Sequence, residues 1–140
     1  MLARSQAVVG RFGAASSAYA RSVAIFPDNA QLLADYADTL AMARGGRLAG
    51  EPEKLIERAL RADPNNVKAL ALAGTVAFEN KNFATAVNYW ERVRNLIPSG
   101  SEFARSIQNS ISEAKGLASA GGGTRKVTGA PGKTQASALR

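Results

Sequence analysis

The sequence predicts an all-α fold, a solenoid of about two and a half helix pairs followed by a C-terminal capping helix. Three prolines support this prediction, because Pro27, Pro64 and Pro98 each follow an apolar run with helical spacing and lie 37 and 34 residues apart. Proline ends a helix because it lacks the amide that the next turn requires and clashes with the turn before it. A period near 34 residues is typical of two-helix repeats.

Aromatic and small residues recur at fixed distances before these prolines. The residues 15, 12 and 8 positions before the first proline are Phe12, Ala15 and Tyr19, and those before the third are Phe83, Ala86 and Trp90. Spacings of three and then four residues place side chains on one helical face. We therefore expect the aromatic side chains to lie in the core, with the alanines allowing the helices to approach closely.

The repeat register divides the chain into units of about 1–27, 28–64 and 65–98, with a capping helix over 99–118. These segments form one predicted domain over 1–118. The register places Met1 near the sixth position of the first unit, so the first helix of that unit begins without its first turn. Residues 119–140 are rich in Gly, Ser, Thr and Lys and contain no aromatic residue, so we expect a disordered tail.

Capping residues and an enlarged turn mark the ends of the predicted helices. Asp28, the pair Asn65–Asn66 and the run Ser99–Glu102 follow the three prolines, and such side chains accept hydrogen bonds from free amides at helix starts. The middle unit is three residues longer because of the glycine-rich run 44–52. In that run we expect Gly45 to cap the preceding helix.

The net charge of +7 is confined to the two ends of the chain. Eleven basic and eleven acidic side chains lie between Asp28 and Lys115, whereas the segments before and after contain no acid. The charge is therefore weak evidence for a nucleic-acid partner. The first 27 residues also have the composition of a mitochondrial-type transit peptide, a weaker interpretation because they fit the repeat.

Composition excludes several kinds of chemistry. The chain contains no histidine and no cysteine, which excludes disulfides, thiol nucleophiles, histidine-based catalysis and zinc sites built from nitrogen and sulfur ligands. Asp35 and Asp38 are interpreted as a solvated helix face rather than a metal or acid–base pair. We expect no enzyme activity, no cofactor and no metal. No run approaches the roughly twenty apolar residues of a membrane helix, so we expect no membrane span in this chain.

The distances of the aromatic and small residues from the prolines resemble those of tetratricopeptide repeat (TPR) proteins. The third unit matches best, with Leu70, Gly74, Phe83, Ala86 and Trp90 before Pro98. A narrower resemblance rests on the run GGRLAGEP (residues 45–52) between YADTLAM and LIERAL. There the chain is similar, over about residues 1–118, to the TPR module of cytochrome c-type biogenesis proteins. These are haem-lyase accessory subunits of the bacterial cytochrome c maturation system and of the related nitrite reductase assembly system.

The resemblance implies a periplasmic module that holds apocytochrome c, chiefly through its C-terminal helix, beside other haem-lyase subunits. Two departures from the family pattern are the lack of upstream membrane helices and of a further C-terminal domain in this sequence. The alternatives are a generic TPR scaffold for another protein partner and, less favoured, a basic-tailed nucleic-acid-associated protein.

The TPR register also indicates which residues line a partner-binding groove. The predicted groove is apolar and lined by small residues, which suits an amphipathic helix, and Met42 and Phe78 are its adaptable anchors. The alternative for these two is packing beneath the next repeat. The lysine and asparagine of carboxylate-clamping TPR proteins are replaced here by alanine and aspartate. The predicted groove residues are Gln31, Ala34, Asp38, Ala41, Met42, Lys68, Ala71, Thr75, Phe78 and Glu79.

Overall fold

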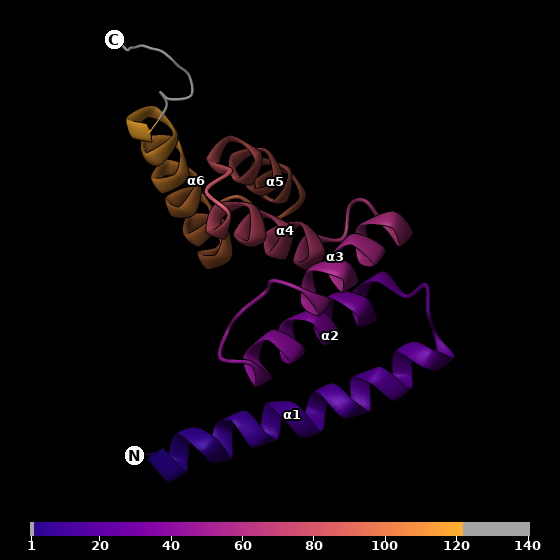
Figure 1. The fold of residues 1–140 in the computed structure, drawn as a ribbon. Coiled ribbons are helices and arrows are strands. Elements are labelled where there is room, and N and C mark those ends of the chain that lie inside the picture. Colours follow the sequence, from indigo (N-terminus) through magenta and orange to yellow (C-terminus); the bar gives the residue numbers. More distant parts are fainter. Residues whose placement is uncertain (1, 122–140) are drawn as a thin grey trace. The chain divides into compact units, whose positions relative to one another are not determined.

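The chain forms six helices in the computed structural model, which describes residues 2–121 and the side chains of residues 10–120. The described residues contain no strand, and the helix order matches the expected half pair, two pairs and terminal helix, so the all-α prediction is confirmed (Figure 1). In chain order the helices are α1 (Leu2–Ile25), α2 (Ala30–Ala43), α3 (Glu51–Ala62), α4 (Val67–Glu79), α5 (Phe83–Leu96) and α6 (Glu102–Gly121).

The helices belong to two compact units, and the boundary falls within α4, between Val76 and Ala77. In the first unit α1 packs against α2, and α2 packs against α3. In the second unit α5 packs against α6.

The first repeat unit differs from the expectation in one respect. Residues 2–25 form one continuous helix, whereas the register placed a shortened first helix before the one that contains Phe12. Gly10 and Gly13 lie inside α1, but an internal glycine lowers helix stability by only about 1 kcal/mol and does not end a helix. Packing against α2 stabilises the longer helix.

Side-chain caps begin α2, α4 and α6 shortly after each proline. Asn29 Oδ1 accepts from the Leu32 amide at 2.9 Å, and Asn66 Oδ1 accepts from the Ala69 amide at 2.8 Å. Ser101 Oγ accepts from the Ala104 amide at 3.0 Å. Asn66 is one of the expected caps. The cap of α2 is Asn29, one residue beyond the predicted Asp28. The cap of α6 is Ser101, two residues beyond the predicted Ser99.

The enlarged turn after α2 has the predicted glycine cap. Gly45 adopts a φ of 79°, and the Gly46 amide donates to the Ala41 carbonyl at 2.7 Å, closing a Schellman motif. Gly50, with a φ of 89°, is the N-cap residue that precedes α3. Pro52 is buried in the first turn of that helix, where its missing amide has no helical partner to lose.

The core of the second unit is built around Trp90, which is only 6% exposed. The ring of Phe78 lies 5.8 Å from the Trp90 ring and 5.3 Å from the Phe83 ring between centroids. Helical spacing predicts an apolar stripe on α6 made of Phe103, Ile107, Ile111, Ala114 and Ala118. Of these, Ile107, Ile111 and Ala114 are buried. The apolar stripe of α6 begins at buried Ala104, however, and Phe103, expected to start it, is exposed.

Helix α6 continues to Gly121, three residues beyond the expected end of the capping helix. The remainder of the predicted disordered tail, residues 122–140, lies outside the described residues.

Replacing Trp90 with alanine tests this core. Loss of a buried tryptophan leaves a cavity, so we expect Trp90→Ala to lower the free energy of unfolding by about 3–5 kcal/mol. Urea unfolding followed by circular dichroism measures the change, with Phe103→Ala as the exposed control, expected to cost less than about 1 kcal/mol. If Trp90→Ala does not fold, Trp90→Phe provides the graded comparison. Equal stability of Trp90→Ala and wild type would contradict the packing described.

Candidate binding face

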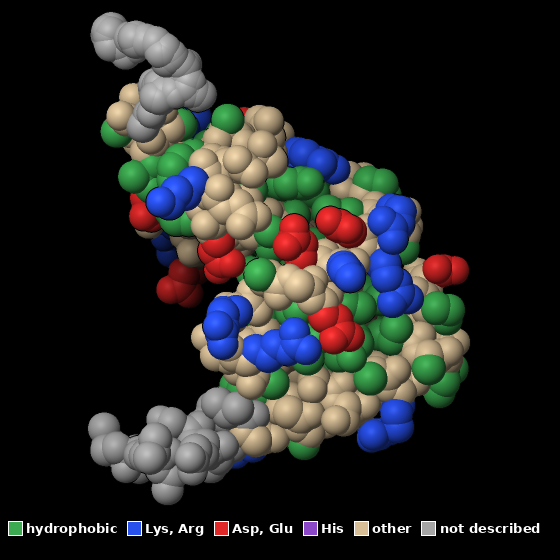
Figure 2. All heavy atoms as spheres, in the orientation of Figure 1, with side chains coloured by type: hydrophobic (Ala, Val, Ile, Leu, Met, Phe, Trp, Pro, Cys, Tyr) green, Lys and Arg blue, Asp and Glu red, His purple; other side chains and the backbone are tan. Residues whose placement is uncertain are grey.

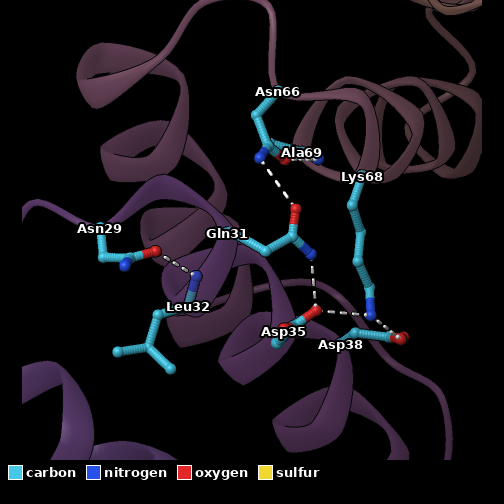
Figure 3. Close-up of polar contacts among 8 residues, drawn as sticks. All are labelled: Asn29, Gln31, Leu32, Asp35, Asp38, Asn66, Lys68 and Ala69. Atoms are coloured by element: carbon cyan, nitrogen blue, oxygen red, sulfur yellow. Dashed lines mark hydrogen bonds and ion pairs between the residues drawn. The ribbon is translucent and has the colours of Figure 1, made fainter.

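A network of polar side chains joins α2 to the part of α4 that lies in the first unit (Figure 3). Asn66 Nδ2 donates to Gln31 Oε1 at 3.1 Å, and Gln31 Nε2 donates to Asp35 Oδ1 at 3.0 Å. Lys68 Nζ then donates to the same Asp35 oxygen at 2.9 Å and forms an ion pair with Asp38 Oδ2 at 3.2 Å. The network fixes the neighbouring surfaces of the two helices side by side.

Lys68 is the charged centre of this network. Partial burial lowers the pKa of its ammonium group, but the hydrogen bonds and charges of Asp35 and Asp38 raise it by more, and the pKa lies above the ordinary value of 10.5. Lys68 therefore stays protonated at neutral pH. One ammonium group balances two carboxylates, so the cluster carries a net charge of −1 when all three groups are ionised.

Helical spacing places Met42 one turn beyond Asp38 on α2, and Ala71 one turn beyond Lys68 on α4. Met42, in the last turn of α2, is 44% exposed. On α4, Ala71 and Thr75 are partly exposed, and Thr75 Oγ1 donates to the Ala71 carbonyl at 3.1 Å. This bond satisfies the hydroxyl group within its own helix, so the threonine methyl is available for apolar contact. We call the surface formed by Gln31, Asp38, Met42, Lys68, Ala71 and Thr75 the α2–α4 face.

The predicted groove residues do not all lie on a surface. Ala34 and Ala41 are buried, with 0% and 2% of their surface exposed, so these two side chains belong to the core and are removed from the groove. Phe78 and Glu79 lie in the second unit. Phe78 is half-buried against Phe83 and Trp90, and Glu79 is exposed.

Sequence reasoning missed two members of the network, Asp35 and Asn66. Asp35 was assigned to a solvated face, yet it is half-buried and bonded to Gln31 and Lys68. The repeat contained a signal for this network, because Asn66 follows Pro64 by two residues, just as Asn29 follows Pro27. Lys68 likewise occupies the position of Gln31, four residues after a proline.

The carboxylates of the network are paired within the first unit. Both aspartates are engaged by Lys68, and within the described residues no group of three or more acidic side chains could hold a metal ion. Across residues 2–121 no helix combines the length and apolar character needed to cross a bilayer. On the face drawn in Figure 2, basic and acidic side chains lie next to one another.

Comparison with known proteins identifies one family. Residues 1–104 match the sequence model described as the cytochrome c-type biogenesis protein H TPR domain. The chain is 28% identical over 130 residues to cytochrome c-type biogenesis protein CycH of Pseudomonas aeruginosa, covering 93% of this chain and 32% of that protein. It is 31% identical over 117 residues to CcmH of Escherichia coli K12, covering 81% of this chain and 33% of that protein.

A shorter match, 30% identical over 79 residues, is to the formate-dependent nitrite reductase complex subunit NrfG of Escherichia coli O157:H7. It covers 56% of this chain and 40% of that protein. The chain thus spans about a third of the length of the first two relatives.

The raised pKa of Lys68 predicts how stability depends on pH. Because the folded-state pKa exceeds the unfolded value of 10.5, the contribution of Lys68 is fully present below pH 10.5 and is lost as the pH rises through the folded-state pKa. The group is partly exposed, so we expect Lys68→Met to cost about 1 kcal/mol or less near neutral pH, and the difference from wild type to vanish in alkali.

Urea unfolding at a series of pH values measures this difference. Lys54→Met is the matched control, because Lys54 is exposed and forms no ion pair with the described residues. A Lys68→Met penalty that stays constant above pH 10.5, or that Lys54→Met shares, would contradict the assignment.

Proposed function

Because the chain belongs to the cytochrome c-type biogenesis protein H TPR domain family, we propose that it is a protein-binding module that holds apocytochrome c for haem attachment. The segment held is the C-terminal helix of the apocytochrome, and the site is the α2–α4 face. The role is one of binding and presentation, with the haem chemistry performed by other proteins.

One observation carries the proposal: the polar network presents an exposed methionine and two small side chains on helices that it ties together. A surface of this kind suits an amphipathic helix, whose apolar residues contact Met42, Ala71 and Thr75. Methionine adapts its shape to different partners because its side chain is unbranched and polarizable. The pairing of α2 with α4 before the partner arrives reduces the ordering cost of binding.

The proposed setting follows from the same family membership. We place the module in the periplasm, where it would present the apocytochrome to the subunits of a haem-lyase complex. A generic scaffold for a different protein is the principal alternative, and the same face would serve it. A nucleic-acid role has less support, because the basic and acidic side chains between Asp28 and Lys115 are equal in number.

A peptide titration tests the proposal. The probe is a labelled synthetic peptide with the sequence of the C-terminal helix of a c-type cytochrome, and fluorescence anisotropy measures its binding to the full chain. We expect a Kd below about 100 µM, with loss of about tenfold in Met42→Gln, since that change removes about 1.4 kcal/mol of apolar contact. Met42 is already exposed, so we expect the melting temperature to stay within a few degrees of wild type.

Leu117→Gln is the matched control, because Leu117 is an exposed apolar residue of α6 in the second unit. Phe78→Glu is a poor probe, since a charge beside Trp90 is expected to destabilise the second unit. Absence of binding at high micromolar peptide would remove the main support for the proposal. Equal weakening by Met42→Gln and Leu117→Gln would place the site elsewhere.

A further inference from the structure

A second feature of the first unit lies outside the α2–α4 face. A hollow of about 300 Å³ opens between the turn that joins α1 to α2 and the last turn of α3. None of its lining residues belongs to the network that joins α2 to α4. They are Pro27, Asp28, Arg58, Arg61 and Ala62.

Two guanidinium groups line this hollow from one helix. Arg58 Nη2 donates to the Pro27 carbonyl at 3.2 Å, which anchors the guanidinium at the rim and leaves its other N–H groups available. Arg61 follows three residues later on α3, a spacing that places both side chains on the same side of the helix. The Arg61 side chain makes no hydrogen bond or ion pair with the described residues.

The charge of the hollow is not balanced. Asp28 is the acidic residue in its lining, and within the described part of the chain it forms no ion pair with either arginine. Two arginines and one aspartate leave a net charge of +1. Arginine donates two parallel hydrogen bonds to a carboxylate, which makes a carboxylate the natural complement of such a pair.

Two large apolar residues directly precede Pro27, a residue that lines the hollow, in the sequence. Ile25 and Phe26 directly precede Pro27 and are 70% and 59% exposed, the two highest values among the large hydrophobic residues described. Contiguous exposed apolar residues rimmed by polar ones mark interaction sites, and Ile25 and Phe26 are neighbours in the chain. Aromatic residues and arginine are enriched at the energetic centres of protein interfaces. The combination is therefore that of a protein contact.

We propose that this hollow is a second contact site, which binds an acidic segment of a partner protein. A glutamate or aspartate carboxylate lies between Arg58 and Arg61, and a neighbouring large apolar side chain packs against Phe26. The inference does not depend on the α2–α4 face, so either site can fail its test while the other passes. Two arginines beside an aspartate form too small a basic surface for nucleic acid, which needs a run of phosphate contacts.

Nuclear magnetic resonance of the full chain tests the proposal through the side-chain Nε–Hε signals of its arginines. The probe is the capped tripeptide N-acetyl-Leu-Glu-Leu-amide, and its control is the same peptide with Gln in place of Glu. We expect the Arg58 and Arg61 signals to shift saturably with the Glu peptide at concentrations up to about 10 mM, and at least tenfold more weakly with the Gln peptide.

Two variants and an internal control complete the test. Arg61→Gln, at an exposed position, is expected to abolish the response of Arg58 without changing the fold, and Phe26→Ser to weaken binding severalfold. Arg47, exposed in the turn after α2, provides a signal that is expected to stay in place. Equal shifts with both peptides, no shift at Arg58 and Arg61, or an equal shift at Arg47 would overturn the proposal. The proposal would also be overturned if the Arg58 and Arg61 signals responded only to duplex DNA or to anionic lipid vesicles.

Discussion

The candidate binding face depends on the side chains of Asn66, which precedes and caps α4, and of Lys68, in the first turn of α4. Asn66 is buried and uses both ends of its amide, since its oxygen caps α4 and its nitrogen bonds Gln31 of α2. Lys68 then holds Asp35 and Asp38, so two carboxylates of α2 are partly neutralised by a lysine of α4. A buried polar group that is left unsatisfied is costly, so these bonds specify how α2 and α4 pair as well as stabilising the pair.

The repeat arrangement could be predicted from the sequence because its signals are local. Proline ends a helix wherever it falls, and polar residues just after it cap the next one, so the helix boundaries follow from Pro27, Pro64 and Pro98. The glycine turn after α2 was equally readable, since Gly45 occupies a backbone conformation that side chains disfavour. Burial of Trp90 agrees with its place in the repeated pattern, whereas Phe12, Tyr19 and Phe83, from the same pattern, are only half-buried.

The details that sequence reasoning missed depend on contacts between helices. The register marked Ala34 as a groove residue, yet that position is covered completely. Phe103 has the right spacing for the buried stripe of α6, but Ala104 is buried in its place. The bond from Arg58 to the Pro27 carbonyl joins residues 31 positions apart, and no sequence period predicts it. Such features depend on how helices rotate against one another, which residue type alone does not determine.

We propose that a partner helix lies on the α2–α4 face. The most direct measurement is a map of backbone amide shifts in the full chain when the cytochrome-helix peptide is added. We expect the largest shifts at Met42, Ala71 and Thr75, with smaller ones at Gln31 and Lys68. Shifts confined to α5 and α6, or to the turn around Pro27, would contradict it.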